Sequence, residues 1–195
     1  MNYKAYWEKA ISYSAYREGI GDLLAEGKTT GENHSEAMLD YTRMNLKRMK
    51  RIDRTYTPSS ADKDFLSQKG VEEYWLLITE AWCGDAAQIL PALKKMADSQ
   101  AGIKMRLVLR DENLELMDQF LTNGVSRSIP ILIRLSTQDF SLLGKWGPRP
   151  AAAQQILIEG KEKAQSADVM KEAIHLWYAR NKIVDIESEI MALYS

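Results

Sequence analysis

The segment between residues 71 and 109 contains two short apolar runs on either side of a stretch with helical pattern. The runs "VEEYWLLIT" and "IKMRLVL" have the length of strands, and their nearly continuous apolar character is typical of strands covered on both faces. A helix is predicted between them, from about Gly84 to Ser99. This order predicts a βαβ unit, in which the two strands are parallel and joined by a right-handed crossover.

The chain after this unit continues the alternation of helices and strands. Asp111 or Asn113 can cap a helix, and Gly124 suits the left-handed end of that helix. A further helix is predicted from about Pro150 to Lys163, because proline is tolerated in the first turn. Between these helices, two strand-like runs predict an antiparallel hairpin, "IPILIRL" and "DFSLLGKW". The predicted core order is β-α-β-α-β-β-α, an α/β fold.

The first seventy residues have helical periodicity throughout. A first helix is predicted from residues at the spacing that lines one helix face: Tyr3, Tyr6, Trp7, Ala10 and Ile11. Gly19 and Gly21 weaken it, and "EGKTTGEN" ends it. A second helix should begin near Asn33 or Ser35 and end before "TPSSADKD".

The segment after Lys163 is predicted to form one long amphipathic helix. We therefore expect an N-terminal helical extension over 1–70, a core over 71–165 and a C-terminal helix over 166–195. The C-terminal helix should pack on the extension, so that the chain forms one compact unit. A monomer and a homodimer are both compatible with this arrangement.

Charge and hydropathy argue against nucleic-acid and membrane partners. Lys and Arg total 26 against 27 for Asp and Glu, so the net charge of -1 provides no broad attraction to phosphate. The basic run "KRMKRIDR" alternates with Met49 and Ile52 at helical spacing, which favours a solvated helix face over a nucleic-acid interface. No apolar stretch approaches the roughly 18 residues of a membrane span, and the N-terminus lacks a secretory pattern.

Cys83 is the only cysteine, so the chain cannot form an internal disulfide. This favours a reducing compartment, and the cytoplasm is the simplest location. His34 and His175 are far apart, and no group of residues has the spacing of a zinc site, so we expect no metal.

The segment around Cys83 resembles the active-site region of the thioredoxin superfamily. Three features support the resemblance in the right order along the chain: "WCGDA" at Trp82 to Ala86, Pro91 inside the predicted helix, and "SIPILI" around Pro130. The resemblance covers roughly 71–163 and implies a thioredoxin-like fold, a central mixed sheet flanked by helices. More narrowly, the chain resembles bacterial thioredoxin-like proteins with helical extensions at both ends.

The resemblance also implies which residues surround the sulfur. Pro130 should be a cis proline lying against Cys83, and the backbone of Ile129 should pair with an extended substrate. Trp82, Gly84 and Asp85 should complete the groove. The bond before Pro130 is expected to be cis on the resemblance alone, because only about one X–Pro bond in twenty is cis.

The position of Cys83 predicts two opposing effects on the pKa of its thiol. A cysteine in the first turn of a helix faces the positive end of the helix dipole and unpaired N–H groups, which lower its pKa. Asp85 and Glu80 place negative charge nearby and act in the opposite direction, so the sequence does not fix the net shift. Leu77 stands where dithiol members of the superfamily bury a carboxylate, which weakens the case for ordinary thioredoxin catalysis.

Ala86 stands where the second, resolving cysteine of a dithiol enzyme would be. A full dithiol cycle is therefore excluded, and release of a mixed disulfide requires an external thiol such as glutathione. Two hypotheses follow. The chain is a monothiol oxidoreductase that uses Cys83 on a protein or small-molecule disulfide, without a bound cofactor, or it is a thioredoxin-fold binding or scaffold module without turnover.

Overall fold

The computed structural model describes residues 1–181 and 183–195. Its elements, in chain order, are α1 (Tyr3–Lys9), α2 (Tyr13–Ala25), α3 (Glu36–Thr55), α4 (Ser60–Gln68), β1 (Glu73–Thr79), α5 (Gly84–Asp98), β2 (Ile103–Leu109), α6 (Leu114–Met117), the 3₁₀ helix η1 (Asp118–Phe120), β3 (Ile131–Ser136), β4 (Leu142–Trp146), α7 (Ala151–Glu162), α8 (Ala167–Asn181) and α9 (Val184–Ala192). The chain divides into two compact units, Met1–Pro148 and Arg149–Ser195.

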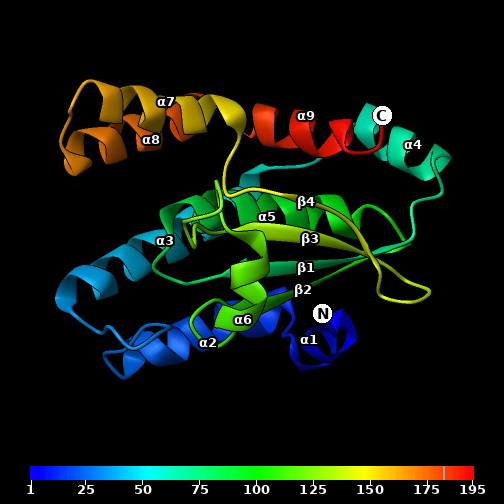
Figure 1. Ribbon diagram of the computed structural model, residues 1–195, viewed down its shortest axis with the longest axis horizontal. Helices are drawn as coiled ribbons and strands as arrows, with labels where there is room; N and C mark the ends of the chain where they lie inside the picture. The colour runs from blue at the N-terminus through cyan, green and yellow to red at the C-terminus, as the bar shows by residue number, and fades with distance from the viewer. Residues whose placement is uncertain (182) are drawn as a thin grey trace. The chain divides into compact units, whose positions relative to one another are not determined.

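The first unit contains a four-stranded mixed sheet in the order β2-β1-β3-β4 (Figure 1). The central strand β1 runs parallel to β2, with Leu77 opposite Leu107, and antiparallel to β3, with Leu77 opposite Leu132. β3 and β4 form an antiparallel pair. These pairings confirm the predicted βαβ unit, the hairpin and the β-α-β-α-β-β order, and they make the fold α/β.

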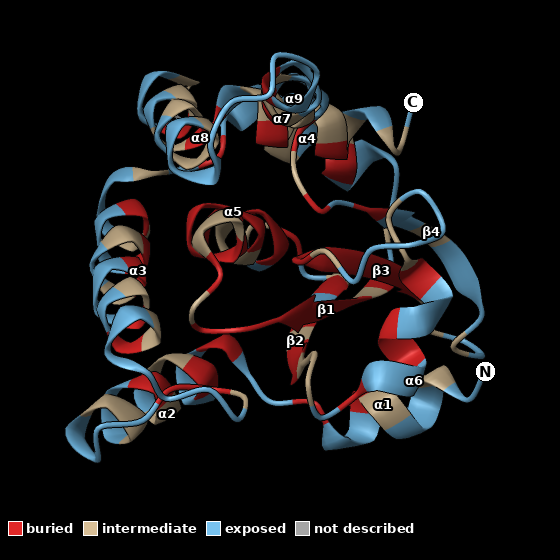
Figure 2. Cartoon of the chain, turned by 60° about the vertical axis from the view of Figure 1, so that its left-hand side comes forward, coloured by how far each residue is buried: buried red, intermediate tan, exposed pale blue. Residues whose placement is uncertain are grey.

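Helices cover the sheet on both faces. All residues of β1 except Tyr74 are buried, as expected for a central strand packed on both faces. In Figure 2 the buried helix α5 lies on one side of the sheet, and α1, α2 and α6 lie on the other. α3 packs along α5, while α1 and α2 contact β2.

The predicted first helix is two helices, because the chain leaves the helical path between Lys9 and Tyr13. Here Ile11 forms an antiparallel bridge with Leu107, with both N–H···O distances 2.9 Å. This pairing covers part of the free edge of β2, and Ile11 stays 40% exposed. The expectation that Ile11 lines a helix face was therefore wrong. Ser12 then caps α2 by accepting the N–H of Ala15.

Two further expectations about helices need correction. The segment "TPSSADKD" ends α3 as expected, but it also begins α4, whose first turn is capped by the Ser59 hydroxyl. The helix after β2 is only one α-turn followed by η1 and ends at Phe120, so Gly124 does not terminate it. Gly124 instead has φ 72° in a tight turn in which Thr122 and Ser126 exchange backbone hydrogen bonds.

The second unit is helical and contains α7, α8 and α9. α7 packs against α8, where the absence of a side chain at Gly160 gives room to Met170. The expectation of a single long C-terminal helix was wrong, because the segment forms two helices, α8 and α9. Ile183, just before α9, has φ 79°, which is incompatible with a continuous α-helix. Glu189 accepts the N–H of Ala151 at 2.7 Å and so joins α9 to the start of α7.

This division groups α7 with the C-terminal helices, whereas the sequence pattern assigned that segment to the core. The boundaries at residues 70 and 165 were predicted from the helical pattern and the extent of the thioredoxin resemblance, and they stay a prediction. Within the described part of the chain, every helix is too short or too polar to cross a bilayer.

Candidate functional site

Cys83 lies at the end of the connection between β1 and α5. It is the N-cap of α5, and its sulfur accepts the backbone N–H of Ala86 at 3.4 Å. The predicted site residues Gly84 and Asp85 form the first turn of the helix and are half-buried. The helix start therefore directs an N–H group at the sulfur, as the sequence predicted.

The chain before β3 lies on the other side of the sulfur. The Ile129–Pro130 peptide bond is cis, and both residues are buried. The Cys83 thiol donates to the carbonyl oxygen of Ile129, with 3.3 Å between sulfur and oxygen. Gly147 has φ 119° and packs against the carbonyl of Pro130 so closely that a Cβ would not fit there.

Trp82 forms the rim of the site together with two arginines. The guanidinium carbon of Arg110 lies 4.7 Å from the centre of the Trp82 ring. Arg110 also donates to the carbonyl of Arg127 at 3.4 Å, and Arg127 makes a two-pronged ion pair with Asp118 at 2.6 and 2.8 Å. Through Arg110, these contacts connect the segment before Pro130 to the Trp82 ring.

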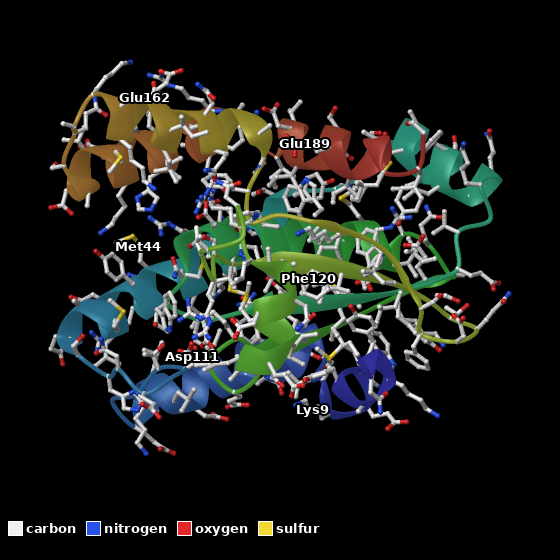
Figure 3. All side chains as sticks on the ribbon, in the orientation of Figure 1. Lys9, Met44, Asp111, Phe120, Glu162 and Glu189 are labelled. Carbon is white, nitrogen blue, oxygen red and sulfur yellow. The ribbon has the colours of Figure 1, made fainter. Side chains whose placement is uncertain are left out.

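Side chains from α3 and from the loop between α2 and α3 bind the backbone of Ala81, two residues before the cysteine. The N–H of Ala81 donates to Oγ1 of Thr30, and its carbonyl accepts from Nδ2 of Asn45, both at 2.9 Å. Gly31, with φ 75°, lies where a Cβ would be 2.5 Å from Oδ2 of Asp111 and 3.6 Å from Nε1 of Trp82. Asp111, labelled in Figure 3, comes from the loop after β2. Sequence reasoning missed all of these contacts.

Two buried titratable side chains, Glu80 and Tyr16, lie near the cysteine. Glu80 has no exposed surface, and burial raises the pKa of its carboxyl, although the Thr30 side chain and the N–H of Asp111 act in the opposite direction. Tyr16 from α2 is also buried, and its hydroxyl lies 3.4 Å from Oγ1 of Thr79. Burial raises the pKa of Tyr16, and the charges of Glu80 and Cys83 raise it further.

Leu77, which the resemblance places where dithiol members of the superfamily bury a carboxylate, is fully buried and apolar. Ala86, which the resemblance places at the position of a resolving cysteine, is 1% exposed. Among the residues described, no group of three His, Cys, Asp or Glu side chains is arranged to hold a metal ion.

A family model described as thioredoxin matches residues 31–168, which is more than half of the chain. The chain belongs to this thioredoxin family. The match begins within the loop that carries Gly31 and includes α3, so it takes in part of the N-terminal helical segment as well as the sheet. No curated protein matches the chain significantly.

Two solved structures resemble this thioredoxin-family chain in fold. One is a crystal structure of a protein of unknown function from Pseudomonas aeruginosa, with 18% identity and a TM-score of 0.59, covering 95% of this chain and 92% of the other. The second is an HIV epitope-scaffold, with 16% identity and a TM-score of 0.59, covering 99% of this chain and 97% of the other. At these identities the similarity extends to the thioredoxin-like fold and no further.

Proposed function

We propose that the chain is a monothiol thiol–disulfide oxidoreductase in which Cys83 is the nucleophile. The observation that carries the proposal is the position of its sulfur, between the Ala86 N–H at the start of α5 and the Ile129 carbonyl before Pro130. A helix-start N–H stabilises a thiolate, and the thiolate is the reactive form of cysteine.

The proposed cycle uses glutathione and needs no second cysteine. In the first step the Cys83 thiolate attacks the glutathione sulfur of a protein–glutathione mixed disulfide. A Cys83–glutathione disulfide forms, the original S–S bond breaks, and the protein thiolate leaves. A glutathione thiolate from solution then attacks this disulfide, which regenerates the Cys83 thiolate and forms oxidised glutathione. Each cycle therefore consumes one free glutathione thiol, and the other half of the oxidised glutathione comes from the substrate.

This chemistry suits a protein or small-molecule disulfide in a reducing compartment such as the cytoplasm, where free glutathione is abundant. A single cysteine in 195 residues is consistent with such a compartment. The helix-start thiol needs no resident cofactor for either step, because the external thiol is a co-substrate. The proposed groove consists of Trp82, Gly84, Asp85, Ile129 and Pro130.

A second candidate function is a binding module without turnover. The observation that favours it is burial: Cys83 is only 8% exposed, and its thiol already occupies the Ile129 carbonyl, the group proposed to pair with substrate. In this alternative the groove binds an extended peptide and the sulfur takes no part.

Reduction of a glutathionylated protein by glutathione separates the two functions. Wild type and Cys83→Ser are compared at equal concentration, with oxidised glutathione measured by coupled NADPH consumption. The oxidoreductase predicts turnover in the wild type that Cys83→Ser abolishes. A measured thiol pKa above about 8.5, together with equal background rates for both proteins, would leave only the binding module.

A further inference from the structure

The helices α7 and α8 of the second unit form a groove that the proposed function does not use. The two helices pack against each other and lie side by side in Figure 1. The groove has a volume of about 390 Å³, within the range of about 300–1,000 Å³ that is typical of small-molecule sites. The residues that line this α7–α8 groove are Ile156, Ala173, Leu176, Trp177, Arg180 and Asn181.

The walls of the α7–α8 groove are mainly apolar. Ile156 contributes from α7, and Leu176 and Trp177 contribute from α8. Leu176 is 48% exposed, and Ile156 and Trp177 are half-buried. Ala173, Trp177 and Arg180 follow one another at a spacing of four and three residues, so they share one face of α8. The groove therefore offers apolar surface that a ligand with a hydrocarbon portion can cover.

One positive charge lies in this apolar lining. Arg180 is exposed, and its guanidinium makes no ion pair or hydrogen bond with any residue that the structure describes. The residues three and four positions before it on α8 are Trp177 and Leu176, so its neighbours on the helix surface are apolar. Asn181 accepts the N–H of Asp185 through Oδ1 at 3.0 Å, which leaves the Nδ2 donors of the same amide available. None of the six described residues that line the groove is acidic.

We propose that the α7–α8 groove binds a small carboxylic acid with a hydrocarbon chain. The carboxylate pairs with the Arg180 guanidinium, whose planar N–H groups match a carboxylate, and accepts a further hydrogen bond from Nδ2 of Asn181. The hydrocarbon chain covers the exposed apolar surface of Ile156 and Trp177. The six lining residues belong to the second unit and Cys83 belongs to the first, so this binding does not depend on the proposed thiol chemistry.

The charge of Arg180 decides between this ligand and other occupants. In a two-fold dimer the same surface lies on both subunits, so a second copy docked through the groove would bring two Arg180 side chains into one interface. Like charges placed together in an interface are unfavourable. A ligand without an anionic group would gain nothing from the guanidinium. Charge complementarity therefore favours a small anionic ligand.

Titration of the full chain with octanoate, followed by the ¹H–¹⁵N signals of the tryptophan indoles, tests the site. The chain has five tryptophans, and the signal that is lost in Trp177→Phe is that of Trp177. Octanoate should shift this signal saturably and leave the signal of Trp82 in place. Arg180→Gln should raise the dissociation constant about tenfold, which corresponds to about 1.4 kcal/mol. Arg54→Gln, which removes an exposed arginine of α3, should bind octanoate as wild type does.

Octanamide, a neutral analogue of the same length, should bind wild type and Arg180→Gln with equal affinity. Octanoate that binds both proteins equally, or that leaves the Trp177 signal unshifted, overturns the inference. If Arg180→Gln does not fold, tighter binding of octanoate than of octanamide to wild type supports the inference, and equal binding overturns it. A Trp177 signal that moves with protein concentration in the absence of octanoate would show that a second copy occupies the groove, which also overturns it.

Discussion

The backbone N–H of Ala86 points at the sulfur of Cys83, with 3.4 Å between nitrogen and Sγ. The sulfur of Cys83 therefore lies close to the backbone of residue 86, the position at which a dithiol enzyme would have its second cysteine. Ala86→Cys should consequently form a disulfide with Cys83 under mild oxidation. Counting alkylated thiols before and after reduction checks this, with Asp85→Cys as the control, because residues two apart on a helix do not face each other.

Ala86 is 1% exposed, so the added sulfur needs space, and overpacking costs about 1–3 kcal/mol. A folded Ala86→Cys variant that keeps two free thiols under oxidising conditions would show that the sulfur of Cys83 does not face this position. An equal yield of disulfide from Asp85→Cys would show the same.

Thr30→Val should change the reactivity of Cys83, although residue 30 is more than fifty positions away in the sequence. The variant leaves the buried N–H of Ala81 without its acceptor, at a cost of about 1–3 kcal/mol. Because this hydrogen bond no longer holds the segment before Cys83 in place, the rate at which iodoacetamide alkylates Cys83 should change several-fold. Thr29→Val is the matched control, because the Thr29 hydroxyl bonds the Thr42 hydroxyl at 2.6 Å, whereas the Ala81 N–H bonds Thr30. Equal alkylation rates in the two variants would contradict the prediction.

The sheet and the helix that follows the cysteine could be predicted because their residues carry local patterns. β2 runs from Ile103 to Leu109, as expected, since a short apolar run between polar turns has few alternatives. The interruption of the N-terminal helix around Ile11 could not be predicted, because it depends on the pairing of Ile11 with Leu107, almost a hundred residues away. The C-terminal helical segment is interrupted at Ile183, which has φ 79°, although no glycine or proline at that position indicates an interruption.

The candidate site was predicted only in its sequence-local part. Trp82, Cys83 and Pro130 were found because they belong to short motifs. Thr30 and Asn45 lie in segments whose sequences indicate only a loop and a helix, and nothing local distinguishes a threonine that bonds a distant N–H. The environment of Glu80 is set in part by α2 and the loop after it, so its burial follows from tertiary packing.

Gly31→Ala should destabilise the chain, whereas Gly19→Ala should stabilise it. A side chain at Gly31 meets the Asp111 carboxylate, and its φ of 75° alone costs about 1–2 kcal/mol for an L-residue. Gly19 lies within α2 with nothing within 4 Å of an added Cβ, so alanine should gain about 0.5–1 kcal/mol. Urea unfolding of both variants measures the difference, and effects of the same sign would contradict it.

Arg134→Met should be among the most destabilising single changes in the sheet. Arg134 on β3 forms a two-pronged buried ion pair with Glu73 on β1, at 2.8 and 2.6 Å. Removing the arginine leaves a buried carboxylate uncompensated, at a cost of about 3–5 kcal/mol. The double variant Glu73→Gln with Arg134→Met should unfold at higher urea than Arg134→Met alone. If the double variant were no more stable, the ion pair would not be the cause.

The stability of the chain should depend on pH through Glu80. Burial raises the pKa of this carboxyl in the folded state above its unfolded value, so between the two values the folded state binds more protons. The contribution of Glu80 is therefore fully present below the unfolded pKa and is lost as the pH rises through the folded pKa. Glu80→Gln removes this dependence, so its free energy of unfolding should gain on that of wild type as the pH increases above about 4.3. Urea unfolding of both proteins from pH 4 to 8 measures the difference, and a constant difference across this range would show that Glu80 titrates alike in the folded and unfolded chains.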